Sequence, residues 1–502
     1  MFLNDIIEAI ERRRKRFSAK ITEIQKTKDI NTKALLCAQA SIYIANYPCG
    51  ILYSQKLENE LQQLASLISS PAISTVAPET ESFLHVFSRV YDSGGHTRIG
   101  ERWIHASPAH QKHDVVLISQ GKRPVPSRLQ EIIIQKNGSM HRLSGFPLEK
   151  AVELRSLAHR YTCIILHVHA YDIVPMLAFG RTDFPRPIIL FNHADHQFWL
   201  GTSITDLVVN FRRLAMALNT EARNVRNQIL LPLPMEELPI ASTTYSRNAL
   251  KISLGFSTTS KVIITLAPSY KFRPLEGLDF LEMMKQILER EPDAVLLAIG
   301  PSEQERYWKR ACAESHGRIR ALGIVPANLL DQYLQISDLA IESFPLGSPT
   351  ALMEIARHHV PCLALTMPGN QNDQFEEAGI LCPDVPTLIE RSVNILENPR
   401  QDNLLYEIIK RDCLPDKFRK RLFELSARLP KVHEYRRPPE QPVHEISALE
   451  LIIIRNRYLR FWSIRFWGEL VVRFTINLYI RFIYPLGLRR KEYDFLNSYG
   501  LM

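Results

Sequence analysis

The sequence predicts an α/β protein in which two doubly wound parallel sheets follow one another, with helical segments at both ends of the chain. Its 502 residues exceed the ~250–300 that a single hydrophobic core usually organises. From residue 82 onward, apolar runs of strand length alternate with helical segments, which is typical of parallel sheets. A proline-containing stretch at residues 229–239 divides these runs into two series.

Composition and charge are those of a folded protein with acidic partners. A hydrophobic content of 45% with 23% charged residues excludes a disordered chain. The net charge of +9 and the isoelectric point near 9.1 favour nucleotide sugars, anionic polymers, phospholipid head groups or nucleic acid as partners. The seven cysteines are scattered and form no C-x-x-C pair, which argues against disulfides and against a zinc site. The sequence has no secretory signal and no apolar run of about 18 residues, so a cytoplasmic location is expected.

Residues 1–80 are predicted to be an N-terminal helical region. Isoleucines precede the basic run Arg12–Arg16, which predicts an amphipathic helix with a solvated basic face. Residues 34–47 and 57–68 also have helical periodicity and enough apolar side chains to pack. A small, polar, proline-containing linker then leads into the first strand.

The two sheets are expected in residues 81–235 and residues 236–430. Ligands of open parallel sheets bind beyond the carboxyl ends of the strands, so the loops there are the candidate functional positions. The expected strands lie at 82–90, 113–119, 163–170, 187–194 and 206–211 in the first domain, and begin near 261, 293, 318 and 338 in the second.

Residues 431–502 have a different composition. A polar, proline-rich linker is followed by a tail, residues 446–502, in which arginines alternate with tryptophan, tyrosine and aliphatic residues. This pattern predicts an amphipathic helical tail at a membrane surface, and packing on the protein itself is the alternative. Arg473 and Arg481 interrupt the apolar run, so a membrane-spanning helix is not expected. Nucleic acid is not an expected partner, because no recognition motif is present.

The central functional candidate is the turn Gly347-Ser348-Pro349-Thr350, which joins a predicted buried strand to a helix. Glycine permits close backbone approach, the hydroxyls can donate hydrogen bonds, and proline suits the first helical turn. Unpaired N–H groups and the positive end of the helix dipole make such a turn an anion site. Glu354 lies one helical turn beyond Thr350 and can accept from ribose hydroxyls. The turn therefore predicts nucleotide binding, and the alternative is an ordinary helix cap.

This stretch resembles a segment of a known enzyme family. The sequence FPLGSPTALMEIARHHVPCLAL, residues 344–365, is similar to the nucleotide-sugar segment of glycosyltransferases with the GT-B fold, which has two facing Rossmann-like domains. In that family a small-residue turn holds the diphosphate and a Glu holds the ribose. The order of elements matches over residues 81–430. The resemblance implies a nucleotide-sugar substrate, expected to be UDP-linked, and no requirement for a metal or another cofactor.

Lys271 and Arg273 follow the first predicted strand of the second domain. Two cations at a strand end can neutralise a departing diphosphate. The Tyr-Lys-x-x-Pro pattern resembles the loop with the catalytic lysine of O-linked N-acetylglucosaminyltransferases and related bacterial protein glycosyltransferases. The resemblance gives Lys271 that role, and Arg273 has no clear counterpart. The chain lacks the tetratricopeptide array and the His-Thr-Thr turn of that family, which puts a protein acceptor in doubt.

The loop Asp92–Arg98 follows the first strand of the first domain. Gly94 and Gly95 allow a ligand to approach the backbone, and His96 is a candidate general base. The loop does not fit G-x-G-x-x-G, so a dinucleotide is not predicted. The alternative is that His96 is an ordinary polar loop residue.

A second polar cluster, residues 192–199, follows an apolar strand. His193 holds the position where GT-B enzymes have a histidine near the sugar of the sugar donor. Asp195 or His196 could deprotonate an acceptor hydroxyl, or Asp195 could orient a histidine. The alternative is a structural cluster beneath Trp199.

His167, His169 and Asp172 could suggest a metal site, because alternate strand residues share a face. Histidine spacing alone is poor support for this, and the chain has no D-x-D, so no metal is predicted. His169 resembles a histidine that several GT-B families have near a strand end.

Together these features predict a glycosyltransferase with a glycan or lipid-linked acceptor, acting in surface polysaccharide synthesis at the inner face of the membrane. Three alternatives are a protein O-glycosyltransferase, a nucleotide-sugar 2-epimerase and a non-catalytic GT-B partner subunit. The identity of the sugar, the stereochemistry of transfer and the oligomeric state are not predicted.

Overall fold

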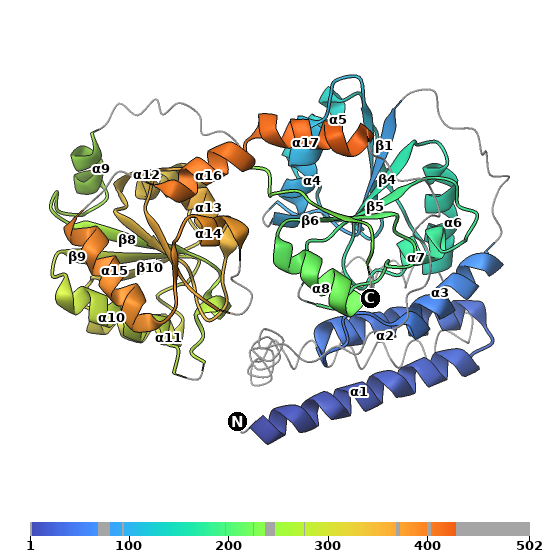
Figure 1. The fold of residues 1–502 in the computed structure, drawn as a ribbon, viewed down its shortest axis with the longest axis horizontal. Coiled ribbons are helices and arrows are strands. Elements are labelled where there is room, and N and C mark those ends of the chain that lie inside the picture. Colours follow the sequence, from blue (N-terminus) through green and yellow to red (C-terminus); the bar gives the residue numbers. More distant parts are fainter. Residues whose placement is uncertain are drawn as a thin grey trace. The chain divides into compact units, whose positions relative to one another are not determined.

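The computed structural model describes residues 3–427 except 69–80, 93–94, 196, 224, 236–245, 276, 368–371 and 399–402. The chain divides into two compact units, passing from the first to the second at Pro232–Leu233 and back to the first at Lys417–Phe418. Each unit is a parallel sheet with helices on both faces (Figure 1). The predicted fold class is therefore confirmed. The predicted tail at residues 446–502 lies outside the described residues.

The first sheet has seven strands in the order β3-β2-β1-β4-β5-β6-β7, and every neighbouring pair is parallel. The strand order reverses direction between β1 and β4, which is where doubly wound folds bind ligands. Its strands are β1 (Ser82–Phe87), β2 (Lys112–Leu117), β3 (Met140–Arg142), β4 (Cys163–His167), β5 (Ile188–Phe191), β6 (Leu207–Asn210) and β7 (Gln228–Leu230). Its helices are α4 (Gly95–Ala106), α5 (Ser127–Gln135), α6 (Pro147–Ala158), α7 (Val174–Phe179) and α8 (Arg213–Arg223).

The second sheet has six parallel strands in the order β10-β9-β8-β11-β12-β13. Its strands are β8 (Lys261–Leu266), β9 (Ala294–Ile299), β10 (Ile319–Gly323), β11 (Leu339–Ile341), β12 (Cys362–Leu365) and β13 (Leu381–Cys382). Its helices are α9 (Arg247–Ser253), η1 (Ser269–Phe272), α10 (Phe280–Arg290), α11 (Arg306–Glu314), α12 (Ala327–Ile336), α13 (Pro349–Ala356), α14 (Asp373–Glu377), α15 (Val385–Glu397) and α16 (Leu404–Asp412).

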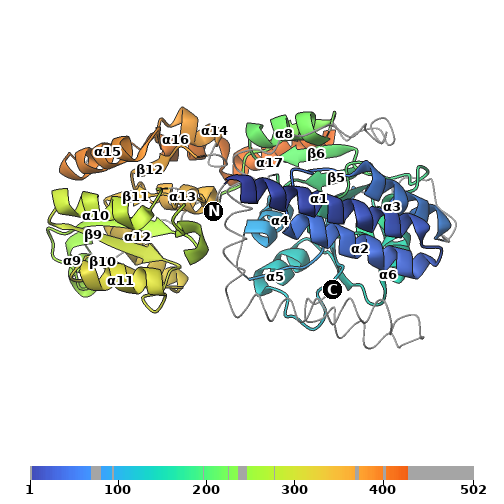
Figure 2. The ribbon, with the colours of Figure 1, turned by 90° about the horizontal axis from the view of Figure 1, so that it is seen from below.

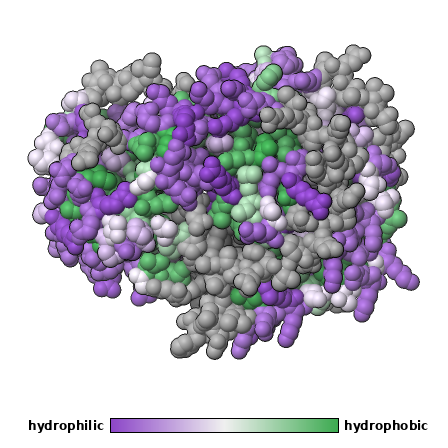
Figure 3. All heavy atoms as spheres, in the orientation of Figure 1, coloured by the Kyte–Doolittle hydropathy of each residue, from purple (hydrophilic) through white to green (hydrophobic). Residues whose placement is uncertain are grey.

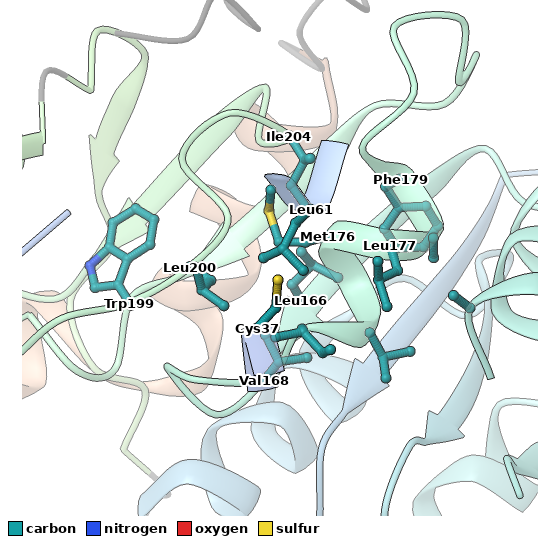
Figure 4. Packing of buried hydrophobic residues seen from close by; sticks show 14 of the residues in the cluster. Cys37, Leu61, Leu166, Val168, Met176, Leu177, Phe179, Trp199, Leu200 and Ile204 are labelled. Atoms are coloured by element: carbon teal, nitrogen blue, oxygen red, sulfur yellow. The ribbon is translucent and has the colours of Figure 1, made fainter. Parts of the chain in front are cut away.

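The N-terminal helices α1 (Leu3–Lys26), α2 (Ile30–Asn46) and α3 (Gln55–Leu67) lie side by side on the first unit (Figure 2). They share one hydrophobic core with the first sheet, because their apolar stripes face its helices and loops. Figure 4 shows Cys37 and Leu61 of these helices gathered with Leu166, Leu200 and Ile204. The helical region is thus an integral layer of the first unit.

The last described helix, α17 (Pro415–Ala427), packs on α4 of the first unit. Phe418 is buried and meets Trp103 edge to face at 6.3 Å, and Arg419 Nε donates to the Ala106 carbonyl at 3.1 Å. These contacts assign the helix to the first unit, although the sequence suggests a second domain that continues to residue 430.

Hydrophilic side chains dominate the coloured surface in Figure 3. None of the described helices is both long and apolar enough to cross a bilayer.

Candidate functional site

The turn at residues 347–350 has the geometry of an anion site. Ser348 occupies the N-cap of α13, and its carbonyl accepts from Ala351 and Leu352 N–H at 2.9 and 3.1 Å. No hydrogen bond within the described chain uses the N–H groups of Gly347, Ser348 or Thr350. Three backbone donors at the positive end of a helix are thus available to a phosphate.

Lys271 lies directly on this turn. Its Nζ donates to the Gly347 carbonyl at 2.5 Å and to Ser348 Oγ at 2.9 Å, although the two segments are 76 and 77 residues apart. Phe272 is buried against Phe280 and Trp308, which fixes the short helix η1. Burial lowers the pKa of Lys271, and the charge of Glu342 opposes that shift. The two features predicted from the sequence therefore form one cationic site.

Arg273 and Glu354 complete the predicted set on this unit. Arg273 is half-buried and forms no hydrogen bond or ion pair with any described residue. Glu354 is half-buried on α13 and forms an ion pair with Arg357, the C-cap residue of that helix. Glu342 is an addition that the sequence reasoning missed. It is a buried acid directly after β11, and that position at a strand end is the signal that could have identified it.

Three histidines of the first unit gather at the carboxyl edge of its sheet. His96 lies on the first turn of α4, His169 follows β4 and His193 follows β5. The His96 ring is centred 4.5 Å from that of His193 and 5.9 Å from that of His169. Gly95 begins α4, while Gly94 and His196 lie outside the described residues.

His96 has a defined tautomer. Its Nε2 lies 2.7 Å from the carbonyl oxygen of His167 and must donate to it, which leaves Nδ1 unprotonated in the neutral ring. Nδ1 is buried and has no hydrogen-bond partner among the described residues. Burial lowers the pKa of His96, so the ring is neutral at pH 7 and Nδ1 can accept a proton.

His193 and His169 are also neutral. Burial, then the neighbouring histidines, place the pKa of His193 well below its ordinary value. Burial, then the charges of His96, Arg89 and Arg123, lower the pKa of His169 to about 3. His193 Nδ1 lies 3.3 Å from the Phe191 carbonyl, which holds the ring close to the end of β5.

The two carboxylates predicted nearby are engaged in structural contacts. Both oxygens of Asp195 accept from Arg212, at 2.6 and 2.9 Å. Asp172 accepts from Ser88 Oγ at 2.5 Å and from the Val174 N–H at 3.0 Å. These contacts suit Asp195 for anchoring its loop better than for proton transfer. Within the described part of the chain, no group of three or more His, Cys, Asp or Glu side chains is arranged to hold a metal.

The sequence reasoning also missed a buried histidine chain across three strands. His85 Nδ1 lies 2.9 Å from His167 Nε2, and His85 Nε2 lies 2.9 Å from His113 Nδ1. All three side chains are fully buried, and burial lowers the pKa of each. Each of three apolar strands contains one histidine, and this pattern is the signal that could have identified the chain.

Comparison with known proteins gives one family match and several similar solved structures. Residues 261–398 match the family described as Glycosyl transferases group 1. A Thermobaculum terrenum O-GlcNAc transferase superposes with a TM-score of 0.51 at 13% identity, over 84% of this chain and 81% of that one. Anabaena HepE in complex with UDP superposes with a TM-score of 0.52 at 12% identity, over 69% of this chain and all of that one. No curated protein sequence matches the chain.

These comparisons establish the fold of the chain, which is GT-B. Within the second unit, residues 261–398 are similar to group 1 glycosyltransferases.

Proposed function

From a GT-B fold whose second unit is similar to group 1 glycosyltransferases, we propose that the chain transfers a sugar from a UDP-linked donor to a membrane-proximal glycan or lipid-linked acceptor. One observation carries this proposal. Lys271 Nζ lies on the turn at residues 347–350, where three unused N–H groups and a helix N-terminus already favour a phosphate. The bound UDP of Anabaena HepE supports the choice of nucleotide.

The second unit would hold the sugar donor. Backbone N–H groups of the turn, the Lys271 ammonium and the Arg273 guanidinium would contact the diphosphate, and Glu354 would accept from the ribose. When the bond between the anomeric carbon and the diphosphate oxygen breaks, negative charge grows on the diphosphate. A fixed cation in a half-buried site stabilises that charge more than bulk water does.

The first unit would supply the base. The acceptor hydroxyl gives its proton to a neutral histidine as its oxygen bonds to the anomeric carbon, and the nucleoside diphosphate leaves with the bonding electrons. His96 is the first candidate, since its Nδ1 is unprotonated and has no described partner, and His193 is the second. The proposal includes no metal or other cofactor, because Lys271 and the turn bring positive charge to the diphosphate.

The acceptor is proposed from the sequence of residues 446–502. Their arginine, aromatic and aliphatic composition suits a membrane surface, where lipid-linked and surface glycans are assembled. Purified chain offered a lipid-linked glycan and a serine-containing peptide, each with labelled UDP-sugar, should glycosylate the glycan. Transfer to the peptide instead would favour a protein O-glycosyltransferase, and epimerised donor without transfer would favour an epimerase.

Calorimetric titration with nucleoside diphosphates and their sugars tests the donor site. Lys271→Ala should weaken UDP binding about 10- to 100-fold, because charged hydrogen bonds contribute roughly 1.5–3 kcal/mol. Glu354→Ala should weaken it less, and Lys309→Ala, which removes an exposed lysine of the same unit, should leave it unchanged. Absence of binding to any nucleotide by folded wild-type chain would overturn the proposal. Tight binding without transfer to any acceptor would favour the partner-subunit alternative.

A further inference from the structure

A fully buried carboxylate of the N-terminal helices lies beneath the histidine-bearing loops of the first unit. Glu58 of α3 is completely inaccessible to solvent. Its Oε1 accepts from the N–H groups of Gly201 and Thr202 at 2.7 and 3.1 Å, and its Oε2 accepts from Ser203 N–H at 2.8 Å. These partners are 143 to 145 residues away in the chain.

The three donors form a concave backbone site for an anion. Gly201 has a φ of +122°, a conformation that side chains strongly disfavour, and this directs successive N–H groups toward one point. Burial raises the pKa of Glu58, while the hydrogen bonds from residues 201–203 oppose that shift. The carboxylate and the loop therefore depend on each other, because neither the charge nor the three N–H groups can reach water.

The loop that Glu58 holds is the continuation of the segment that begins with His193. Asp195 is bound by Arg212. Buried Arg223 donates to the Asp195 and Gln197 carbonyls at 2.9 and 2.7 Å and lies 5.0 Å over the Trp199 ring. Glu58 fixes the far end of the same segment.

One more contact connects this segment to the loop after β4. Leu200 N–H donates to the Ala170 carbonyl at 2.8 Å, next to His169 in the chain. In Figure 4, Leu200 and Ile204 pack in the same apolar cluster as Leu61 of α3. Helix α3 therefore shares an apolar cluster with residues 200 and 204, which flank the loop segment that Glu58 binds.

We propose that Glu58 is a positioning residue for His193, through which the N-terminal helices set the geometry of the acceptor side of the site. This inference rests on the proposed transfer reaction. It gives the helical layer a part in that reaction. A loop that has lost its anchor at one end would no longer hold the His193 ring against that of His96, 4.5 Å away, and either imidazole would then leave the tolerance of a proton transfer.

The substitution Glu58→Gln tests this inference. Glutamine keeps the size of the side chain but replaces one acceptor oxygen by an NH2 group, which faces a backbone N–H and cannot bind it. We expect the kcat of sugar transfer to fall about 10- to 100-fold. The Kd for UDP should stay unchanged, since the proposed donor residues belong to the other unit.

The matched control is Glu60→Gln on the same helix. Glu60 is also buried, but its carboxylate pairs with Lys33 within the helical layer at 2.5 Å. If loss of a buried acid acts only by destabilising the helices, both variants should lose activity alike. A positioning role for Glu58 predicts that only Glu58→Gln loses activity. If Glu58→Gln does not fold, Glu58→Asp replaces it, because aspartate keeps the charge on a shorter side chain. The kcat of Glu58→Asp should also be lower than that of the wild type.

A double-mutant cycle with His193→Ala gives the decisive readout. If Glu58 acts through His193, Glu58→Gln should change kcat little once His193 is absent, whereas a general structural role would give additive losses. Wild-type kcat in Glu58→Gln, or additivity in the cycle, would overturn the inference. Failure of the wild-type chain to bind UDP or to transfer sugar would instead refute the proposed function.

Discussion

At the scale of single residues, the position of one proton determines what His96 can do. A neutral imidazole has one N–H and one acceptor, and the His167 carbonyl requires the N–H at Nε2. The backbone thus fixes the base form without a carboxylate partner. Asp195 differs from His96, because the Arg212 guanidinium donates to both of its carboxylate oxygens. Of the polar groups predicted near the acceptor, the histidines are therefore the better bases.

The substitution His96→Ala should lower the kcat of sugar transfer by about 10²- to 10⁴-fold, the usual contribution of a general base. UDP affinity should be unaffected. His105→Ala is the control, because His105 lies on the same helix with its side chain exposed. Steady-state kinetics with saturating donor measure the effect. Retention of wild-type kcat in His96→Ala together with its loss in His193→Ala would assign the base to His193.

At the scale of elements, one arginine joins the helical layer to the first sheet's helices. Arg155 of α6 is buried, and its guanidinium donates to four carbonyls at the C-terminal ends of α3 and α7. The acceptors are Ala65 (2.9 Å), Ile68 (3.1 Å), Leu177 (2.7 Å) and Ala178 (2.7 Å). Helix ends leave such carbonyls without partners, and a buried cation satisfies them and complements both helix dipoles.

Replacing Arg155 by Met should destabilise the first unit by about 3 kcal/mol or more, because buried carbonyls would lose their partners while the volume is kept. Urea unfolding followed by circular dichroism would measure the loss. Arg160→Met, at an exposed position just beyond the same helix, should change the stability by less than about 0.5 kcal/mol. Equal stability of the two variants would contradict the assigned role.

At the scale of the whole molecule, elements with a local sequence pattern could be predicted from the sequence. Features that depend on contacts between distant segments could not. Alternating apolar runs predicted both parallel sheets, and the small-residue turn predicted the helix start that the structure has at Pro349. Three features instead join segments that are far apart in the chain. Lys271 pairs with the turn at residues 347–350, Glu58 lies beneath residues 201–203, and α17 returns to the first unit. No local periodicity encodes such contacts.

The two units should respond differently to acid. His85, His113 and His167 are buried together in the first sheet, and burial lowers the pKa of each, to about 3 for His113. An unfolded chain binds these protons below about pH 6.5, while the folded unit does not. The unfolded state then binds more protons, so the stability of the first unit should be greatest above about pH 6.5 and fall as the pH drops toward 3. In the described part of the second unit, His358 is the one histidine with a lowered pKa.

Hydrogen exchange at pH 7.5, 6.5 and 5.5 would separate the two units, because peptides from β1 and β4 report on the first and peptides from β8 and β9 on the second. We expect opening free energies of the first unit to fall more steeply with acid.

His113→Phe removes one titrating group at the end of the histidine chain, beside Phe83. It should lower stability at pH 7.5 yet reduce the slope by up to about 1.4 kcal/mol per pH unit, the contribution of one proton. His110→Gln, at an exposed site, should leave the slope unchanged. Parallel pH dependence in the two units would show that the buried histidines take up protons without unfolding, and would contradict the neutral state assigned to them.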